Sequence, residues 1–203
     1  SGNTRTAKTL FTEIRKWHPR AVVRDRIYRS LGDIAVSEGE TEKAIEFYKR
    51  FEREASASIH LGEVRLKMAE LYGTAGKSRE ARETLEATLE TAGVTSAIKA
   101  EVLLKLGQSH VEDNDDKKAI VYFERLYVAY GKFGELNAKA YWARGQSLEK
   151  LKLDREALET YEELVNRDDL KRFEEADKAG KRIVALRRTL PPEPVEEKKE
   201  AAL

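Results

Sequence analysis

Apolar residues recur at spacings of three and four along almost the whole chain, separated by short polar segments that contain glycine or asparagine. This period places apolar side chains on one face of an α-helix. No segment shows the sustained alternation of apolar and polar residues that is typical of a strand, and there are only four prolines. The pattern therefore predicts an all-α chain.

The helical pattern also repeats. One alanine recurs 37 or 38 residues apart, at Ala7, Ala44, Ala81, Ala119 and Ala157. Four residues after it stands a large apolar residue, in turn Phe11, Tyr48, Leu85, Phe123 and Tyr161. Twelve residues before it stands a small residue, in turn Gly32, Ala69, Gly107 and Gly145. We expect two helices per repeat, with the small residue on the first helix allowing the second to approach closely.

A turn is predicted between the two helices of each repeat. The position five residues before the alanine holds Gly39, Gly76, Asn114 and Lys152. Glycine and asparagine favour the left-handed conformation that ends a helix, so Lys152 is the weak copy. The position three before the alanine holds residues that favour a helix N-cap, namely Thr4, Thr41, Ser78, Asp116 and Asp154.

These features resemble the tetratricopeptide repeat family. The best copies are YRSLGDIAVSEGETEKAIEFYKRF, LLKLGQSHVEDNDDKKAIVYFERL and YWARGQSLEKLKLDREALETYEEL, and the resemblance covers roughly residues 4 to 171. It implies a right-handed α-solenoid of antiparallel helix pairs that binds proteins without catalysis. The repeats are longer than the family's usual 34 residues, lack the terminal proline, and place Arg65 where an aromatic residue is usual.

Four segments are expected along the chain. Residues 1–24 read as the second helix of a truncated repeat with a linker, and residues 25–171 as about four repeats. Residues 172–190 are predicted to form a capping helix, which a solenoid needs over its last apolar face. Residues 191–203 form a proline-led, charged tail whose composition favours an extended or disordered segment.

In tetratricopeptide repeat proteins the first helices of successive repeats line a concave groove, where partners usually dock. The resemblance therefore assigns groove positions to Arg29, Asp33, Leu66, Glu70, Leu104, Gln108, Trp142 and Gln146. Leu66, Leu104 and Trp142 would form an apolar ladder of anchors, flanked by amides and carboxylates. The alternative is that Trp142 packs on the capping helix.

The composition and motifs of the chain argue against several other functions. There are no cysteines and only three histidines, none at a metal-ligand spacing. His110 is expected to be a packed core residue, and the acidic run Glu112–Asp116 lacks the pattern of a calcium loop. No phosphate loop or catalytic motif occurs, so we expect no enzyme, cofactor or metal. A net charge of +1, with positive and negative residues interspersed, also disfavours nucleic-acid binding. No apolar stretch is long enough to span a membrane.

The leading hypothesis is thus a scaffold that binds a peptide, helix or tail of another protein. The alternative is self-assembly into a homo-oligomer, through either the capping helix or the N-terminal half-repeat, where Phe11 and Ile14 lack a covering helix. Repeat length and the lysine- and glutamate-rich ending are similar to those of bacterial cell-envelope members, such as the TolA-binding periplasmic protein and the outer-membrane assembly lipoprotein. Periplasm or envelope is the suspected location, with the cytoplasm as the alternative.

Overall fold

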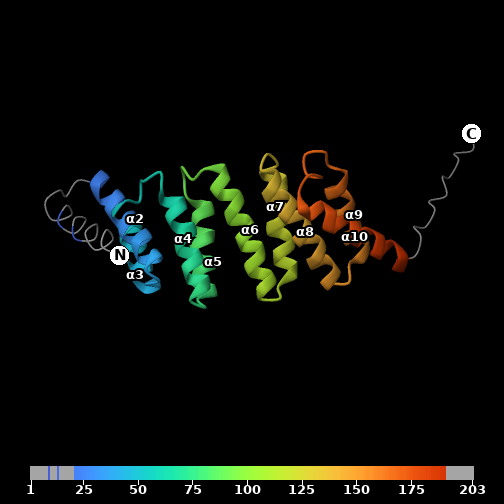
Figure 1. Ribbon diagram of the computed structural model, residues 1–203, viewed down its shortest axis with the longest axis horizontal. Helices are drawn as coiled ribbons and strands as arrows, with labels where there is room; N and C mark the ends of the chain where they lie inside the picture. The colour runs from blue at the N-terminus through green and yellow to red at the C-terminus, as the bar shows by residue number, and fades with distance from the viewer. Residues whose placement is uncertain (1–8, 10–12, 14–20, 191–203) are drawn as a thin grey trace, which may run out of the picture. The chain divides into compact units, whose positions relative to one another are not determined.

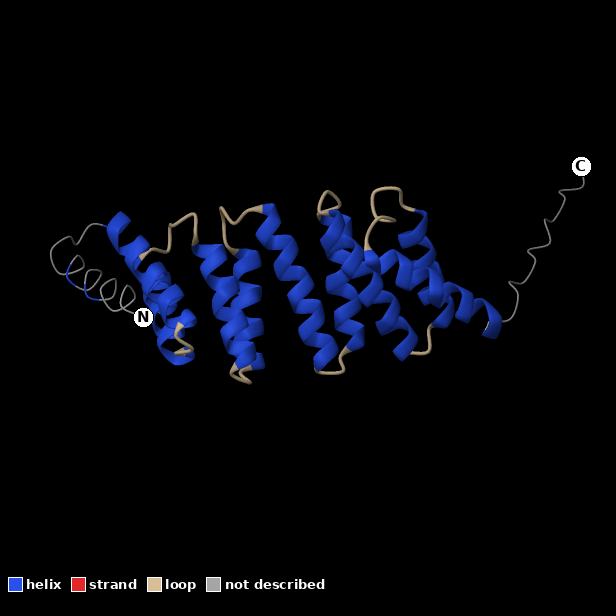
Figure 2. Ribbon diagram, viewed as in Figure 1, coloured by secondary structure: helices blue, strands red, loops and turns tan. Residues whose placement is uncertain are grey.

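The computed structural model describes residues 21–190, together with Thr9 and Glu13. Every regular element within these residues is an α-helix, and Figure 2 shows them joined by short loops. The all-α prediction is confirmed for this part of the chain. The residues divide into two compact units, which meet in the sequence between Asn114 and Asp115.

Unit 1 contains five of the helices. They are α2 (Ala21–Ser37), α3 (Thr41–Glu54), α4 (Leu61–Thr74), α5 (Ser78–Glu90) and α6 (Ser96–Glu112). Helix α2 packs on α3 and α4 packs on α5, so each pair forms one predicted repeat (Figure 1). Helix α6, the first helix of the third repeat, packs on α4 and α5.

Unit 2 contains the remaining helices of the described chain. They are α7 (Asp116–Ala129), α8 (Gly134–Lys150), α9 (Asp154–Asn166) and α10 (Glu174–Thr189). Helix α10 lies against both α8 and α9, in the segment where the sequence predicts a capping helix. Its side chains Ala179, Ile183 and Leu186 are buried in one cluster with Tyr141 and Tyr161. This packing covers the apolar face that the last repeat would otherwise expose to water.

The turns within the repeats follow the predicted left-handed positions. Gly39, Gly76, Asn114 and Lys152 have φ angles of 74°, 72°, 58° and 62°. After three of these residues, the next amide donates to the carbonyl oxygen five residues back, with N···O distances of 2.8–3.0 Å. That hydrogen bond belongs to the Schellman motif, which requires a left-handed residue at the end of the helix. Lys152 therefore adopts the glycine-favoured conformation despite its side chain.

Replacing Lys152 with glycine should raise the free energy of unfolding by about 1 kcal/mol, because it removes the steric cost of a left-handed non-glycine residue. The reciprocal control, Gly76→Ala, should lower stability by a similar amount. A Cβ at Gly76 would meet no atom within 4 Å, so only the backbone conformation would resist it. Chemical denaturation followed by circular dichroism measures both changes, and an unchanged or lowered stability of Lys152→Gly would contradict the prediction.

Four of the predicted N-caps are wrong by one residue, and the fifth, Thr4, lies outside the described residues. Thr41, Ser78, Asp116 and Asp154 are the first residues of their helices, and the caps are Glu40, Lys77, Asp115 and Leu153. The recurring alanine explains the shift, because its amide donates to the carbonyl oxygen four residues back, at N···O distances of 2.9–3.0 Å. The residue that accepts this first helical hydrogen bond is by definition the N-cap.

Candidate functional site

Two glycines of the first helices are in close contact with an aromatic ring of the second. A Cβ added to Gly32 would lie 2.2 Å from Cε1 of Tyr48, and one added to Gly145 would lie 2.2 Å from Cε1 of Tyr161. Such distances are far below van der Waals contact. The predicted role of these glycines in close helix packing is therefore confirmed.

The second repeat replaces this glycine and tyrosine together. Ala69 and Leu85 occupy the two positions, and both side chains are buried. A methyl group on the first helix is thus matched by a smaller side chain on the second. The exchange conserves the fit between the helices but removes an aromatic ring from this repeat.

The hydroxyl groups of both tyrosines donate to carboxylates. Tyr48 donates to Oδ1 of Asp33 at 2.6 Å, and Tyr161 donates to Oε1 of Glu149 at 2.8 Å. Burial raises the pKa of each phenol well above its usual value, and the neighbouring carboxylate adds to the effect. Arg182 of α10 also donates to Glu149, so the carboxylate joins the capping helix to the last repeat.

Ion pairs link the first helices of unit 1. Nζ of Lys67 on α4 lies 2.7 Å from Oδ1 of Asp33 on α2, and Nζ of Lys105 on α6 lies 2.7 Å from Oε1 of Glu70 on α4. Both pairs connect the same positions of successive repeats. We call the exposed part of α2, α4 and α6 that carries Asp33, Lys67, Glu70, Lys105 and Gln108 the first-helix surface.

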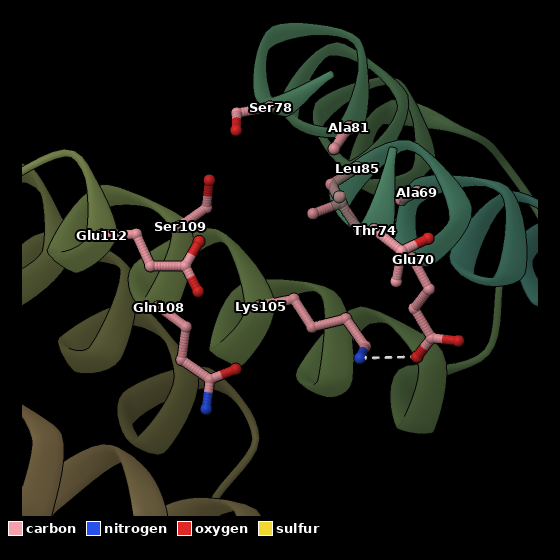
Figure 3. Close-up of a pocket in the computed structure, with 11 residues that line it drawn as sticks. Ala69, Glu70, Thr74, Ser78, Ala81, Leu85, Lys105, Gln108, Ser109 and Glu112 are labelled. Carbon is pink, nitrogen blue, oxygen red and sulfur yellow. Dashed lines mark hydrogen bonds and ion pairs between the residues drawn. The ribbon is translucent and has the colours of Figure 1, made fainter. Parts of the chain in front are cut away.

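Two pockets open on the first-helix surface. The first has a volume of about 480 Å³ and is lined by Asp33, Val36, Tyr48, Lys67, Glu70, Leu71 and Thr74. The second, of about 590 Å³, lies between α4, α5 and α6 (Figure 3). It is lined by Ala69, Glu70, Gly73, Thr74, Ser78, Ala81, Leu85, Lys105, Gln108, Ser109 and Glu112. Glu70 lines both pockets.

Comparison with family models decides the classification. Models described as tetratricopeptide repeat match residues 25–53, 66–134 and 104–171, which together make up more than half of the chain. The chain belongs to the tetratricopeptide repeat family. Members of this family are generally non-catalytic scaffolds that bind other proteins.

Solved structures share the fold at low sequence identity. A tetratricopeptide repeat protein from Parabacteroides merdae is 15% identical, with a TM-score of 0.66 over 82% of this chain and 61% of its own. The apo form of RapI is 13% identical, with a TM-score of 0.75 over 91% of this chain and 54% of its own. MamA is 19% identical, with a TM-score of 0.62 over 91% and 92% of the two chains.

The chain thus spans less than two thirds of the Parabacteroides merdae protein and of RapI. At these identities the likeness concerns the fold alone. The search among curated proteins found no match.

Within this tetratricopeptide fold, the predicted groove residues of unit 1 fall into three groups. Asp33, Glu70 and Gln108 line the two pockets. Leu66 and Leu104 are buried, with 7% and 6% of their surface exposed, so little of either leucine is accessible. Arg29 lies beside α4, where Nη1 is 3.0 Å from Nδ1 of His60 and 3.6 Å from Oε2 of Glu63.

The other two predicted groove residues belong to unit 2. Gln146 is exposed on α8. Trp142 is half-buried, its ring centroid lies 5.4 Å from that of Tyr161, and it packs against the core cluster to which α10 contributes. Packing of Trp142 on the capping helix and its role as a partner anchor both stay predictions.

The contacts of several important side chains were not predicted from the sequence. Arg65, in the usual aromatic position, is only 14% exposed and donates to Glu52 of α3 at 2.7 Å and to the carbonyl oxygen of Ala87 at 3.2 Å. Asn137 is fully buried, and its amide donates to the carbonyl oxygens of Tyr130 and Gly131. Lys67 and Lys105 were also missed, although their shared position in the repeat was a usable signal.

His110 and Asp116, the last residue of the acidic run, are both buried. His110 is buried on α6, as predicted. In the acidic run, Asp116 is buried and its Oδ1 lies 3.5 Å from Nζ of Lys150. Among the described residues, no group of three or more His, Cys, Asp and Glu side chains could hold a metal ion. Every helix in the described part of the chain is too short or too polar to span a lipid bilayer.

Proposed function

We propose that the protein is an interaction scaffold, and that the first-helix surface of unit 1 binds a peptide segment of a partner protein. The observation that carries the proposal is the row of two ion pairs between first helices, beside two adjacent pockets that residues of α3 and α5 also line. A binding surface needs apolar depressions for anchor side chains and polar groups that fix orientation. Both are present on this surface.

The chemistry of the surface suits an extended or helical peptide. Its carboxylates and lysines alternate along the row, so they offer acceptors and donors to a peptide backbone at close intervals. Gln108 adds an amide that can donate and accept. The mixed charge disfavours strongly acidic or basic partners, because either would bring like charges together.

Selection of binders from a random-peptide display library tests this function. Glu70→Lys should weaken the affinity of the protein for the selected peptides by at least about ten-fold, because Glu70 lines both pockets. Glu83→Lys on α5 is the matched control. The two carboxylates are 53% and 58% exposed and each forms one ion pair, but Glu83 lies on a second helix and outside both pockets.

The selected peptides should bind the Glu83→Lys variant as tightly as the original chain, as measured by fluorescence anisotropy. Circular dichroism should show the same helical content for both variants. Equal affinity of the Glu70→Lys variant, or failure to select any peptide, would contradict the proposed function.

Two narrower hypotheses rest on the sequence alone. Phe11 and Ile14, which motivate self-assembly, lie outside the described residues. A role in the bacterial cell envelope is suggested by repeat length and by the composition of residues 191–203, which also lie outside them. Both hypotheses stay predictions.

A further inference from the structure

Helix α7 carries two valines on its exposed face. Val121 and Val128 are 52% and 75% exposed. Their spacing of two helical turns places them on the same side of the helix, about 10 Å apart along its axis. Glu124 and Arg125 lie between them and are also exposed. We call these four residues the α7 stripe.

The other second helices carry polar residues at the two valine positions. Two residues after the recurring alanine, where α7 has Val121, the other repeats have Glu46, Glu83 and Glu159. Nine residues after it, where α7 has Val128, they have Arg53, Glu90 and Asn166. All six of these polar residues are exposed. Packing within a repeat therefore does not require an apolar residue at either position, and the two valines expose apolar surface where the fold accepts charge.

The two charged residues of the α7 stripe are not paired within the described chain. On α5, by contrast, Glu83 forms an ion pair with Arg79. Among the described residues, the side chain of Glu124 forms no hydrogen bond or ion pair, and Arg125 lies over the ring of Tyr122 with Cζ 5.8 Å from the centroid. Both charges can therefore pair with opposite charges on another molecule.

The order of residues in the α7 stripe is self-complementary. Val121 and Val128 are equally far from the midpoint between Glu124 and Arg125. When α7 of a second copy packs antiparallel about that midpoint, Val121 meets Val128 of the second copy and Glu124 meets Arg125 of the second copy. A two-fold axis repeats each contact, as an isologous interface requires. Each valine thus gains an apolar neighbour, and each charge gains an opposite one.

We propose that the α7 stripe is a homodimer contact, in which two copies of the chain pack their α7 helices antiparallel around a two-fold axis. A parallel arrangement would bring Glu124 against Glu124 and Arg125 against Arg125, so the charges favour the antiparallel one. The proposal is independent of peptide binding, since the first-helix surface lies on other helices. It also differs from self-assembly through the N-terminal half-repeat or the capping helix.

The size of the surface sets the strength of the dimer. One face of one helix is smaller than the roughly 800 Å² per partner that a stable interface buries, so the expected dissociation constant lies between about 10 µM and 1 mM. At the ends of the contact, Lys117 comes level with Lys132 of the second copy. Both lysines are exposed, so water and salt screen their repulsion.

Sedimentation equilibrium of the full chain, from about 5 µM to 1 mM, provides the first test. Val121→Glu/Val128→Glu gives α7 the residues that the second repeat has at these positions, and it should weaken dimerisation at least about ten-fold. Val184→Glu on α10 is the matched control, because Val184 is 53% exposed and lies outside the stripe. A monomer at every concentration, or equal weakening by the control, would overturn the proposal.

Charge exchange tests the two-fold pairing itself. Glu124→Arg brings two arginines together, and Arg125→Glu brings two glutamates together, so each variant alone should dimerise several-fold more weakly than the original chain. An equimolar mixture of the two variants should form a heterodimer at least as strong as the original homodimer, because both charge contacts are then attractive. A mixture that associates no more strongly than its components would overturn the proposal.

Cross-linking tests the direction of the helices. The chain has no cysteine, so each introduced thiol is alone in its molecule. A mixture of Val121→Cys and Val128→Cys should form the mixed disulfide several-fold faster than either variant forms a disulfide with itself. In the antiparallel dimer the two copies of one position are about 10 Å apart along the helix axis, too far for a disulfide without movement. Equal rates for all three combinations would overturn the proposal.

Discussion

Replacing Gly145 with alanine should lower the free energy of unfolding by about 3 kcal/mol, because the new methyl group would overlap the buried ring of Tyr161. The Cβ would lie 2.2–2.8 Å from three ring carbons. Tyr161 is fully buried and its hydroxyl is bonded to Glu149, so the ring cannot move aside without losing that hydrogen bond. Chemical denaturation monitored by circular dichroism measures the effect.

Gly180→Ala is the matched control. This glycine lies within α10, and a Cβ there would meet no atom within 4 Å. The alanine should therefore stabilise the protein by up to about 1 kcal/mol through helix propensity alone. If both glycine substitutions gave the same small gain, the close contact at Gly145 would be refuted.

A double substitution tests whether the glycine and the ring act as a pair. Gly145→Ala/Tyr161→Leu recreates the combination of Ala69 and Leu85 found in the second repeat. The double variant should lose less stability than the sum of the two single losses, because leucine leaves room for the methyl group. Strictly additive losses would show that the second repeat tolerates alanine for another reason.

Raising the pH above about 10 should unfold the protein, because buried phenols must ionise. Burial raises the pKa of Tyr127 to about 12, and it also raises the pKa values of Tyr48, Tyr141 and Tyr161 well above 10. A raised folded-state pKa contributes stability that is complete below pH 10 and is lost progressively as the pH rises through the folded-state value. Circular dichroism and tyrosinate absorbance across this range report the two events.

Tyr127→Phe tests the contribution of one of these phenols, because it removes a single ionisable hydroxyl group. The ring of Tyr127 stacks on Tyr141, with centroids 4.1 Å apart, and phenylalanine preserves that contact. The variant should have nearly unchanged stability at pH 7 and unfold at a higher pH than the original chain. Ionisation of all tyrosines near pH 10 with no loss of helix would contradict both expectations.

Local pattern was enough to predict the helices and their turns. The left-handed residues at Gly39, Gly76, Asn114 and Lys152 follow from one position of the repeat, because a turn depends on a few adjacent residues. The N-caps were misplaced because Thr41 and its equivalents have the side chains of a cap but lie one residue inside the helix. Which residue begins a helix depends on a backbone hydrogen bond that side-chain type does not reveal.

The candidate site was less predictable, since it depends on contacts between repeats. The bond from Lys105 to Glu70 joins residues 35 apart, and its existence depends on how successive first helices are aligned. Arg65 shows the same difficulty, because it replaces an aromatic contact with a bond to Glu52 of the preceding repeat. The second pocket is lined by side chains of α4, α5 and α6, which come together only in the folded chain.

The position of α10 has a consequence for how this protein can evolve. Helix α10 lies against α8 and α9 as α6 lies against α4 and α5, so it occupies the place of the first helix of a further repeat. Its Arg182 is bound to Glu149 in the last repeat. A repeat duplicated ahead of α8 would keep α10 on α8 and α9 but would separate Tyr127 from Tyr141, whereas one inserted after α9 would displace α10 and break that ion pair.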